Sequence, residues 1–194
     1  MVYSNIVWQS STAVNVDISG GDVTGNGSSS SYTSNVRSEY VVTSSDGVEI
    51  NTLVSSGDNQ SVTGLGVDPY TDTQTYQAVE YGMLFTNSTW YIYESGTLQA
   101  TYPNSNISDE AKIVRDGSTI RYYINNVLKR TVTGTTTADM YAQSTLRGTG
   151  SVNVKTNATQ GSGGSSGGSG GSGPSAGEGQ IIDHILYFNT VIPR

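Results

Sequence analysis

The feature that most constrains this chain is a series of short segments in which apolar and polar residues alternate, each closed by a turn signal. A period of two is the side-chain spacing of a half-buried β-strand. Asp116-Gly117, between two such runs, is a strong hairpin signal, and Ser95-Gly96 and Asn125-Asn126 separate others. We therefore predict an all-β fold without a helix. The predicted strands cover residues 6–8, 13–18, 38–42, 48–54, 79–85, 89–94, 97–101, 111–115, 119–124, 127–132, 140–142 and 151–155.

Turn signals recur at roughly 8–12-residue spacing, which is typical of an antiparallel β-sandwich or jelly roll. Only 13% of the residues are charged, so most of the polarity comes from Ser, Thr, Asn and Gly, which suits outward strand faces. We predict a turn over residues 20–22, a polar loop over residues 25–31 and mostly loop over residues 55–77. One sandwich domain over residues 1–160 follows from this pattern.

A Gly/Ser-rich linker, residues 161–179, separates this domain from a much more apolar tail, residues 180–194. Left exposed, such a tail would be an aggregation hazard, so we predict that it docks as a strand on its own domain or on another chain. The Gly/Ser tract of residues 161–173, if flexible, spans about 20 Å, which reaches either target. The predicted docking residues are Ile181, Ile182, Ile185, Leu186, Tyr187, Phe188, Val191 and Ile192.

Three segments resemble the concanavalin A-like lectin/glucanase sandwich of bacterial and phage surface proteins. They are residues 6–16, residues 90–96 (WYIYESG) and the hairpin pair of residues 112–128. The resemblance covers about residues 3–158 and implies the fold more than any activity. Asn126 stands where these hairpins usually carry glycine, which Asn can replace because it tolerates the left-handed conformation.

Glucanases that this sandwich resembles hold two catalytic carboxylates on one strand face, in a Glu-x-Asp-x-x-Glu pattern. Retaining hydrolysis needs the pair about 5–5.5 Å apart. This pattern is absent here: Glu39, Glu49, Glu80 and Glu94 each lack an acidic residue at i+2 or i+4. The single histidine, His184, lies in the tail, so a nucleophilic triad would have to cross the linker. We predict that the protein is not an enzyme.

The sequence contains few features that indicate binding to a metal, a nucleic acid or a membrane. The chain has no cysteine and one histidine, which argues against structural zinc. Asp68 and Asp72 are the candidate ligands of a calcium ion, the one cofactor we consider, although Asp in turns is common. The net charge is −7 and the nine basic residues are scattered, so we expect no nucleic-acid partner. We find no signal peptide and no apolar run of membrane-spanning length, and expect no membrane insertion.

The 13 tyrosines give the best signal for a ligand. Along residues 89–94, Tyr91 and Tyr93 share one face while Trp90 and Ile92 share the other, and the strand carrying Tyr123, expected as a neighbour, repeats this alternation. The tyrosine face could bind a sugar, or it could be ordinary cross-strand packing. The candidate ligand-binding residues are Tyr70, Tyr91, Tyr93, Tyr102 and Tyr123.

The leading hypothesis is a structural and adhesive protein on a virion surface, most simply a bacteriophage decoration, fibre or tail protein. The tail would anchor the lectin-like domain to other virion subunits or to sister subunits in a homo-oligomer, and a cell-surface glycan is the candidate ligand. A second hypothesis is an extracellular filament or adhesin subunit whose tail is a donor strand. A third is a carbohydrate-binding module.

Overall fold

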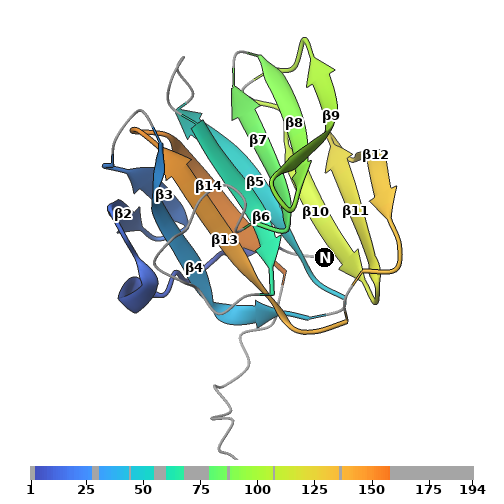
Figure 1. The fold of residues 1–194 in the computed structure, drawn as a ribbon, viewed down its shortest axis with the longest axis horizontal. Helices are drawn as coiled ribbons and strands as arrows, with labels where there is room; N and C mark the ends of the chain where they lie inside the picture. Colours follow the sequence, from blue (N-terminus) through green and yellow to red (C-terminus); the bar gives the residue numbers. More distant parts are fainter. Residues whose placement is uncertain are drawn as a thin grey trace, which may run out of the picture. The chain divides into compact units, whose positions relative to one another are not determined.

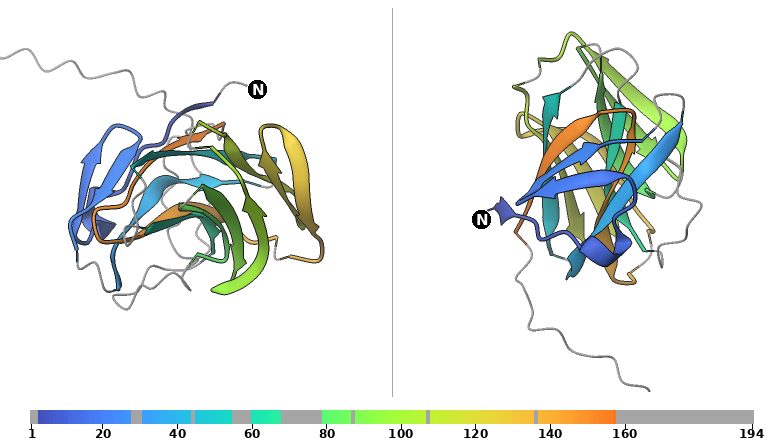
Figure 2. Two further views of the ribbon diagram at one scale, coloured as in Figure 1. Left: turned by 90° about the horizontal axis from the view of Figure 1, so that it is seen from above. Right: turned by 90° about the vertical axis from the view of Figure 1, so that its left-hand side faces the viewer.

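A computed structural model describes residues 3–27, 31–43, 45–54, 60–67, 79–86, 88–106, 108–135 and 137–157. These residues form two antiparallel sheets that face each other as the layers of a sandwich (Figure 1, Figure 2). The all-β prediction is confirmed. Within the described residues the only helical element is η1, a single 3-10 turn at Ser10–Thr12.

One layer is an eight-stranded sheet in the order β12-β11-β10-β5-β14-β3-β2, with β1 paired to β14. The hairpin predicted across Asp116-Gly117 joins β10 to β11, and Asn125-Asn126 joins β11 to β12. The strands are β1 (Ser4–Asn5), β2 (Val16–Ser19), β3 (Asp22–Gly25), β5 (Gly47–Val54), β10 (Ala111–Asp116), β11 (Thr119–Ile124), β12 (Val127–Val132) and β14 (Ser151–Thr156).

The other layer is a six-stranded sheet in the order β4-β13-β6-β7-β8-β9. Its strands β7, β8 and β9 follow one another as a meander, whereas β13 comes from late in the chain and lies between β4 and β6. The strands are β4 (Tyr32–Val42), β6 (Gln60–Gly66), β7 (Tyr81–Thr86), β8 (Thr89–Glu94), β9 (Thr97–Pro103) and β13 (Met140–Arg147).

The core lies between the inner faces of the two sheets. Trp90 and Ile92 enter it from β8, and Ile120 and Tyr122 enter it from β11, all four fully buried. The alternation read from the sequence is thereby confirmed on both strands. Burial raises the pKa of the Tyr122 hydroxyl well above its ordinary value of 10, and the nearby charge of Glu94 adds to this shift.

The tight turns have the backbone that their sequences require. Asn125 and Asn126 have φ values of 50° and 60°, and Ser95 and Gly96 have φ values of 46° and 73°. Two consecutive residues with positive φ define the type I′ turn, whose twist matches that of the strands it joins. Asn126 thus replaces the usual glycine without disturbing the hairpin.

The prediction that residues 55–77 are mostly loop is wrong at β6, which is a central strand between β13 and β7. Ser61, Thr63 and Gly64 hide the strand in the sequence, because small polar residues resemble a loop, yet both faces of β6 are buried. No strand is predicted at β3 either, which starts in the predicted turn at Asp22 and ends at Gly25, in the predicted loop. The described β4 also begins at Tyr32, six residues before the predicted strand, and β13 extends to Arg147.

The edge of β4 is covered by the N-terminal segment. Residues 6–8, predicted as a strand, contribute only an isolated bridge from Trp8 to Ser38, and Val14 makes a second bridge to Asn35. The 3-10 turn η1 lies between these bridges. Covering an edge in this way blocks pairing with other chains.

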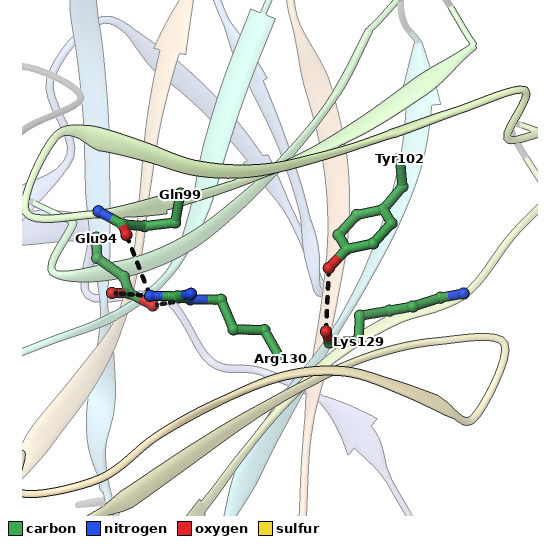
Figure 3. A network of polar contacts seen from close by, with 5 residues as sticks. All are labelled: Glu94, Gln99, Tyr102, Lys129 and Arg130. Carbon is green, nitrogen blue, oxygen red and sulfur yellow. Dashed lines mark hydrogen bonds and ion pairs between the residues drawn. The ribbon is translucent and has the colours of Figure 1, made fainter.

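The opposite edge strands, β9 and β12, are joined by side chains (Figure 3). Arg130 on β12 binds both carboxylate oxygens of Glu94, at 2.7 and 3.0 Å, and donates to Gln99 on β9. The Tyr102 hydroxyl donates to the carbonyl of Lys129 at 3.1 Å. A bidentate arginine–carboxylate pair fixes geometry as well as charge, so these contacts hold the two sheets together at this edge.

Candidate functional site

The candidate site lies on the face of the six-stranded sheet that points away from the core, here called the six-stranded outer face. One row of residues crosses it from β4 to β8, each paired with the next: Arg37, Gln143, Gly64, Gly82 and Tyr93. Each member of the row has a core residue beside it on its own strand. Because side chains alternate along a strand, the row itself faces outward.

Polar atoms at one end of this row are buried without a hydrogen-bond partner. Gln143, Thr145 and Asn35 are only 3%, 2% and 4% exposed, and Thr145 lies directly opposite Asn35. The unsatisfied atoms are Nε2 and Oε1 of Gln143, Oγ1 of Thr145 and Oδ1 of Asn35, which are four of the eight such atoms among the described residues. Buried polar groups without partners are rare in native proteins, so a cluster of four indicates a ligand or ordered water.

The position of the Gln143 amide is set by a glycine. Its amide lies over Gly66 on β6, where the Cβ of any larger residue would collide with it. Gly66 pairs with Tyr141, so Gln143 leans along β13 toward the tyrosine ring. The Arg37 guanidinium lies 4.4 Å from the centre of the same ring, within the range of a cation–π contact. Arg37, Tyr141 and Gln143 therefore form one cluster.

An apolar cluster occupies the rest of this face. It consists of the buried Val62, Val79 and Leu84, with Tyr32, Tyr91 and Tyr93 packed against them. Val62 and Val79 lie over Gly82 and fill the space that a side chain there would take. The Tyr32 hydroxyl donates to Gln60 at 2.7 Å. Aromatic rings beside buried amides and hydroxyls combine the two kinds of group that bind sugars.

The structure separates the tyrosines that the sequence grouped. Tyr91 and Tyr93 lie on the six-stranded outer face, but Tyr123 lies in β11 of the other sheet and faces the opposite side of the sandwich. The expectation that these two strands are neighbours is wrong, because a hairpin signal fixes pairing only with the next strand and not which sheet receives the hairpin. Tyr102 lies at the joined edge, where its hydroxyl already has a partner.

Several predicted residues lie outside the described residues. They are Tyr70, the candidate calcium ligands Asp68 and Asp72, the linker, and the eight docking residues of the tail. Within the described ranges, no group of three or more His, Cys, Asp or Glu side chains could hold a metal ion. The same part of the chain contains no helix long and apolar enough to cross a membrane.

Sequence reasoning missed Asn35, Arg37, Gln143 and Thr145. Each is a polar residue at an alternating strand position, which predicts exposure to solvent. The predicted strand ended at Ala142. Extending its alternation to residue 147 would have placed Gln143 and Thr145 on one face. No pattern in the sequence shows that this face is buried.

Known proteins share the fold but little sequence. No family model matches this chain, and no curated protein matches it. The SPRY domain of human HERC1 is 17% identical over 76% of this chain and 96% of its own, with a TM-score of 0.58. The carbohydrate-binding module CBM66 from Bacillus subtilis is 12% identical over 78% of this chain and 94% of its own, with a TM-score of 0.50.

The carbohydrate recognition domain of Emp47p is also similar, at 11% identity over 79% of this chain and 93% of its own, with a TM-score of 0.50. Identities this low show a common fold and nothing finer. The described domain therefore has the concanavalin A-like β-sandwich fold that its hairpin sequences resemble.

Proposed function

We propose that this protein is a non-enzymatic glycan-binding protein and that its site is the six-stranded outer face. One observation carries the proposal: the unsatisfied amide and hydroxyl groups of Gln143, Thr145 and Asn35 are clustered there. Leaving such groups without partners costs about 1–3 kcal/mol each. Sugar hydroxyls both donate and accept hydrogen bonds, so a sugar that reaches these atoms would supply the partners that they lack.

The surroundings of this cluster support a sugar in particular. Tyr141 lies beside it, and Tyr91 and Tyr93 lie farther along the same face. Sugar rings carry apolar C–H faces that pack on aromatic rings while their hydroxyls reach polar groups. Two proteins with the same fold, CBM66 and Emp47p, are named for carbohydrate binding, which favours the same role here.

The test is a printed oligosaccharide array probed with the full chain and with Gln143→Ala and Thr145→Val variants. We expect the parent chain to bind at least one glycan, and each variant to bind it about tenfold or more weakly, as expected for a lost hydrogen bond in a ligand complex. Asn153→Ala, on the outer face of the other sheet, is the matched control and should bind as the parent does. An array without a bound glycan, or unchanged binding by both site variants, would refute the site.

A second proposal concerns where the domain is displayed. The apolar residues 180–194 follow the Gly/Ser-rich linker, and this contrast favours a tail that anchors the domain to a virion, a filament or a sister subunit. Deleting residues 174–194 should leave a folded, glycan-binding domain that no longer joins its assembly. A truncated protein that still assembles would rule the anchor out.

A further inference from the structure

We infer that the glycan is anionic and that Arg37 on β4 binds its carboxylate or sulfate group. This inference rests on the proposed function, because it names the class of sugar that the six-stranded outer face would take. Arg37 lies directly opposite Gln143 in the pairing of β4 with β13. The arginine and the unsatisfied amide therefore border the same part of this face.

Contacts from two directions hold the Arg37 side chain in place. Its Nε donates to Oε1 of Gln9 at 2.7 Å, and its guanidinium lies against the Tyr141 ring. The backbone N–H of Gln9 in turn donates to the carbonyl of Arg37 at 2.9 Å, so side chain and main chain of these two residues bind each other. A guanidinium fixed in this way loses little further entropy when it binds an anion.

The two Nη nitrogens of Arg37 make no hydrogen bond within the described part of the chain. With Nε occupied by Gln9, they remain as donors for a ligand. A carboxylate or a sulfate accepts two parallel N–H bonds from such a fork, which is the strongest and most directional contact that arginine makes. The Gln143 amide supplies a further donor beside it.

Three other cations of the domain pair with carboxylates. Arg121 pairs with Asp116, Arg130 with Glu94 and Lys155 with Glu49. In the described residues the guanidinium of Arg37 contacts only the neutral side chains of Gln9 and Tyr141. A guanidinium that is fixed by Gln9 and Tyr141 and keeps its Nη donors beside unsatisfied polar atoms favours an anionic group on the ligand.

The test first searches an array that holds carboxylated, sulfated and neutral glycans. Calorimetry then compares the binding of charged and neutral sugars to the full chain. The probes are tetragalacturonate, its fully methyl-esterified form, a κ-carrageenan tetrasaccharide and cellotetraose. The first and third separate a carboxylate from a sulfate, and the ester removes charge from an otherwise equal sugar. We expect one of the two anionic probes, or an anionic glycan from the array, to bind and its neutral counterpart not to bind measurably.

Variants assign the charge to Arg37. Arg37→Gln should lower the affinity for the anionic sugar by about 10- to 100-fold, the range for one charge-assisted hydrogen bond, and Arg37→Lys should recover only part of it. Arg121→Gln removes the same charge from the other sheet and should leave affinity unchanged, which separates a local contact from net charge. Thermal unfolding of each variant confirms that it is folded.

The outcomes distinguish this inference from the proposed function. If neutral glycans bind through Gln143 and Arg37→Gln leaves their affinity unchanged, glycan binding stands and the anionic sugar is refuted. If Arg121→Gln weakens binding as much as Arg37→Gln does, net charge explains the effect and the contact of Arg37 with the sugar is refuted. If no glycan of any class binds, both proposals fall.

Discussion

The two outer faces of this sandwich satisfy their polar groups in different ways. On the eight-stranded sheet, Lys155 lies 3.7 Å from Glu49 and the Asn153 amide donates to Asp22. On the six-stranded sheet, side-chain polar atoms of Gln143, Thr145 and Asn35 are buried without partners. Both faces were built by the same alternation of residues, so what distinguishes them is whether the chain completes its own hydrogen bonds.

This difference is the basis for placing the proposed glycan site on the six-stranded outer face. A face that satisfies its own polar groups gains little from a ligand. A face that buries unsatisfied groups is less stable by itself, and under the proposed function it would regain that energy on binding a glycan. The contrast can be tested by substituting comparable residues on the two faces and comparing the changes in stability.

The largest difference in the free energy of unfolding between the two faces should follow from shortening an apolar side chain. Leu84 on the six-stranded outer face is 3% exposed, and Leu84→Ala should lower the free energy of unfolding by about 2–4 kcal/mol, as in a buried core. Val114 on the outer face of β10 is partly exposed, so Val114→Ala should cost less than about 1 kcal/mol. Urea denaturation measures both. Equal losses of stability would show that the apolar cluster around Leu84 does not act as a buried core.

Polar residues should respond with opposite signs. Gln143→Met removes unsatisfied groups and should raise the free energy of unfolding by about 1–2 kcal/mol while abolishing glycan binding. Asn153→Leu removes a satisfied hydrogen bond and should lower it by about 1 kcal/mol. If Gln143→Met destabilises the domain, the amide has a structural role and the contrast between the faces is lost.

Salt should change mainly the stability that charged pairs on the eight-stranded sheet contribute. Lys155→Gln breaks the partly exposed pair with Glu49 and should cost about 0.5 kcal/mol at low salt. At 1 M NaCl, where the screening length is only about 3 Å, the parent and the variant should become almost equally stable. A cost that persists at high salt would assign the loss to packing of the lysine stem instead.

The smallest effect concerns Tyr3, whose ring lies beneath Lys112 on the eight-stranded side. Burial, and then the charges of Glu49 and Asp46, raise the pKa of its hydroxyl above the ordinary value of 10. The unfolded chain therefore loses this proton first, and stability falls as the pH rises above about 10. Tyr3→Phe should make that decline less steep and leave stability near pH 7 almost unchanged. An identical decline in both proteins would show that Tyr3 is not responsible.

Much of the fold could be predicted because its signals are local. Alternation placed Trp90 and Ile92 in the core, and two asparagines in sequence defined a turn with positive φ. The strand β6 could not be predicted, because Ser, Thr and Gly are buried there only by having strands on both sides. The same limit applies to the tyrosines, which alternation assigned to a face but not to a sheet.

The sequence by itself determined the strands with strong alternation, their hairpins and the inward side of each, because these depend on residues close together in the chain. The tertiary structure decided which strands share a sheet, since that choice is made by contacts distant in sequence. It brought Arg37, on β4, opposite Gln143, on β13, and braced the arginine with Gln9. Burial of an amide is a property of everything around it, so the site could appear only once the sheets were assembled.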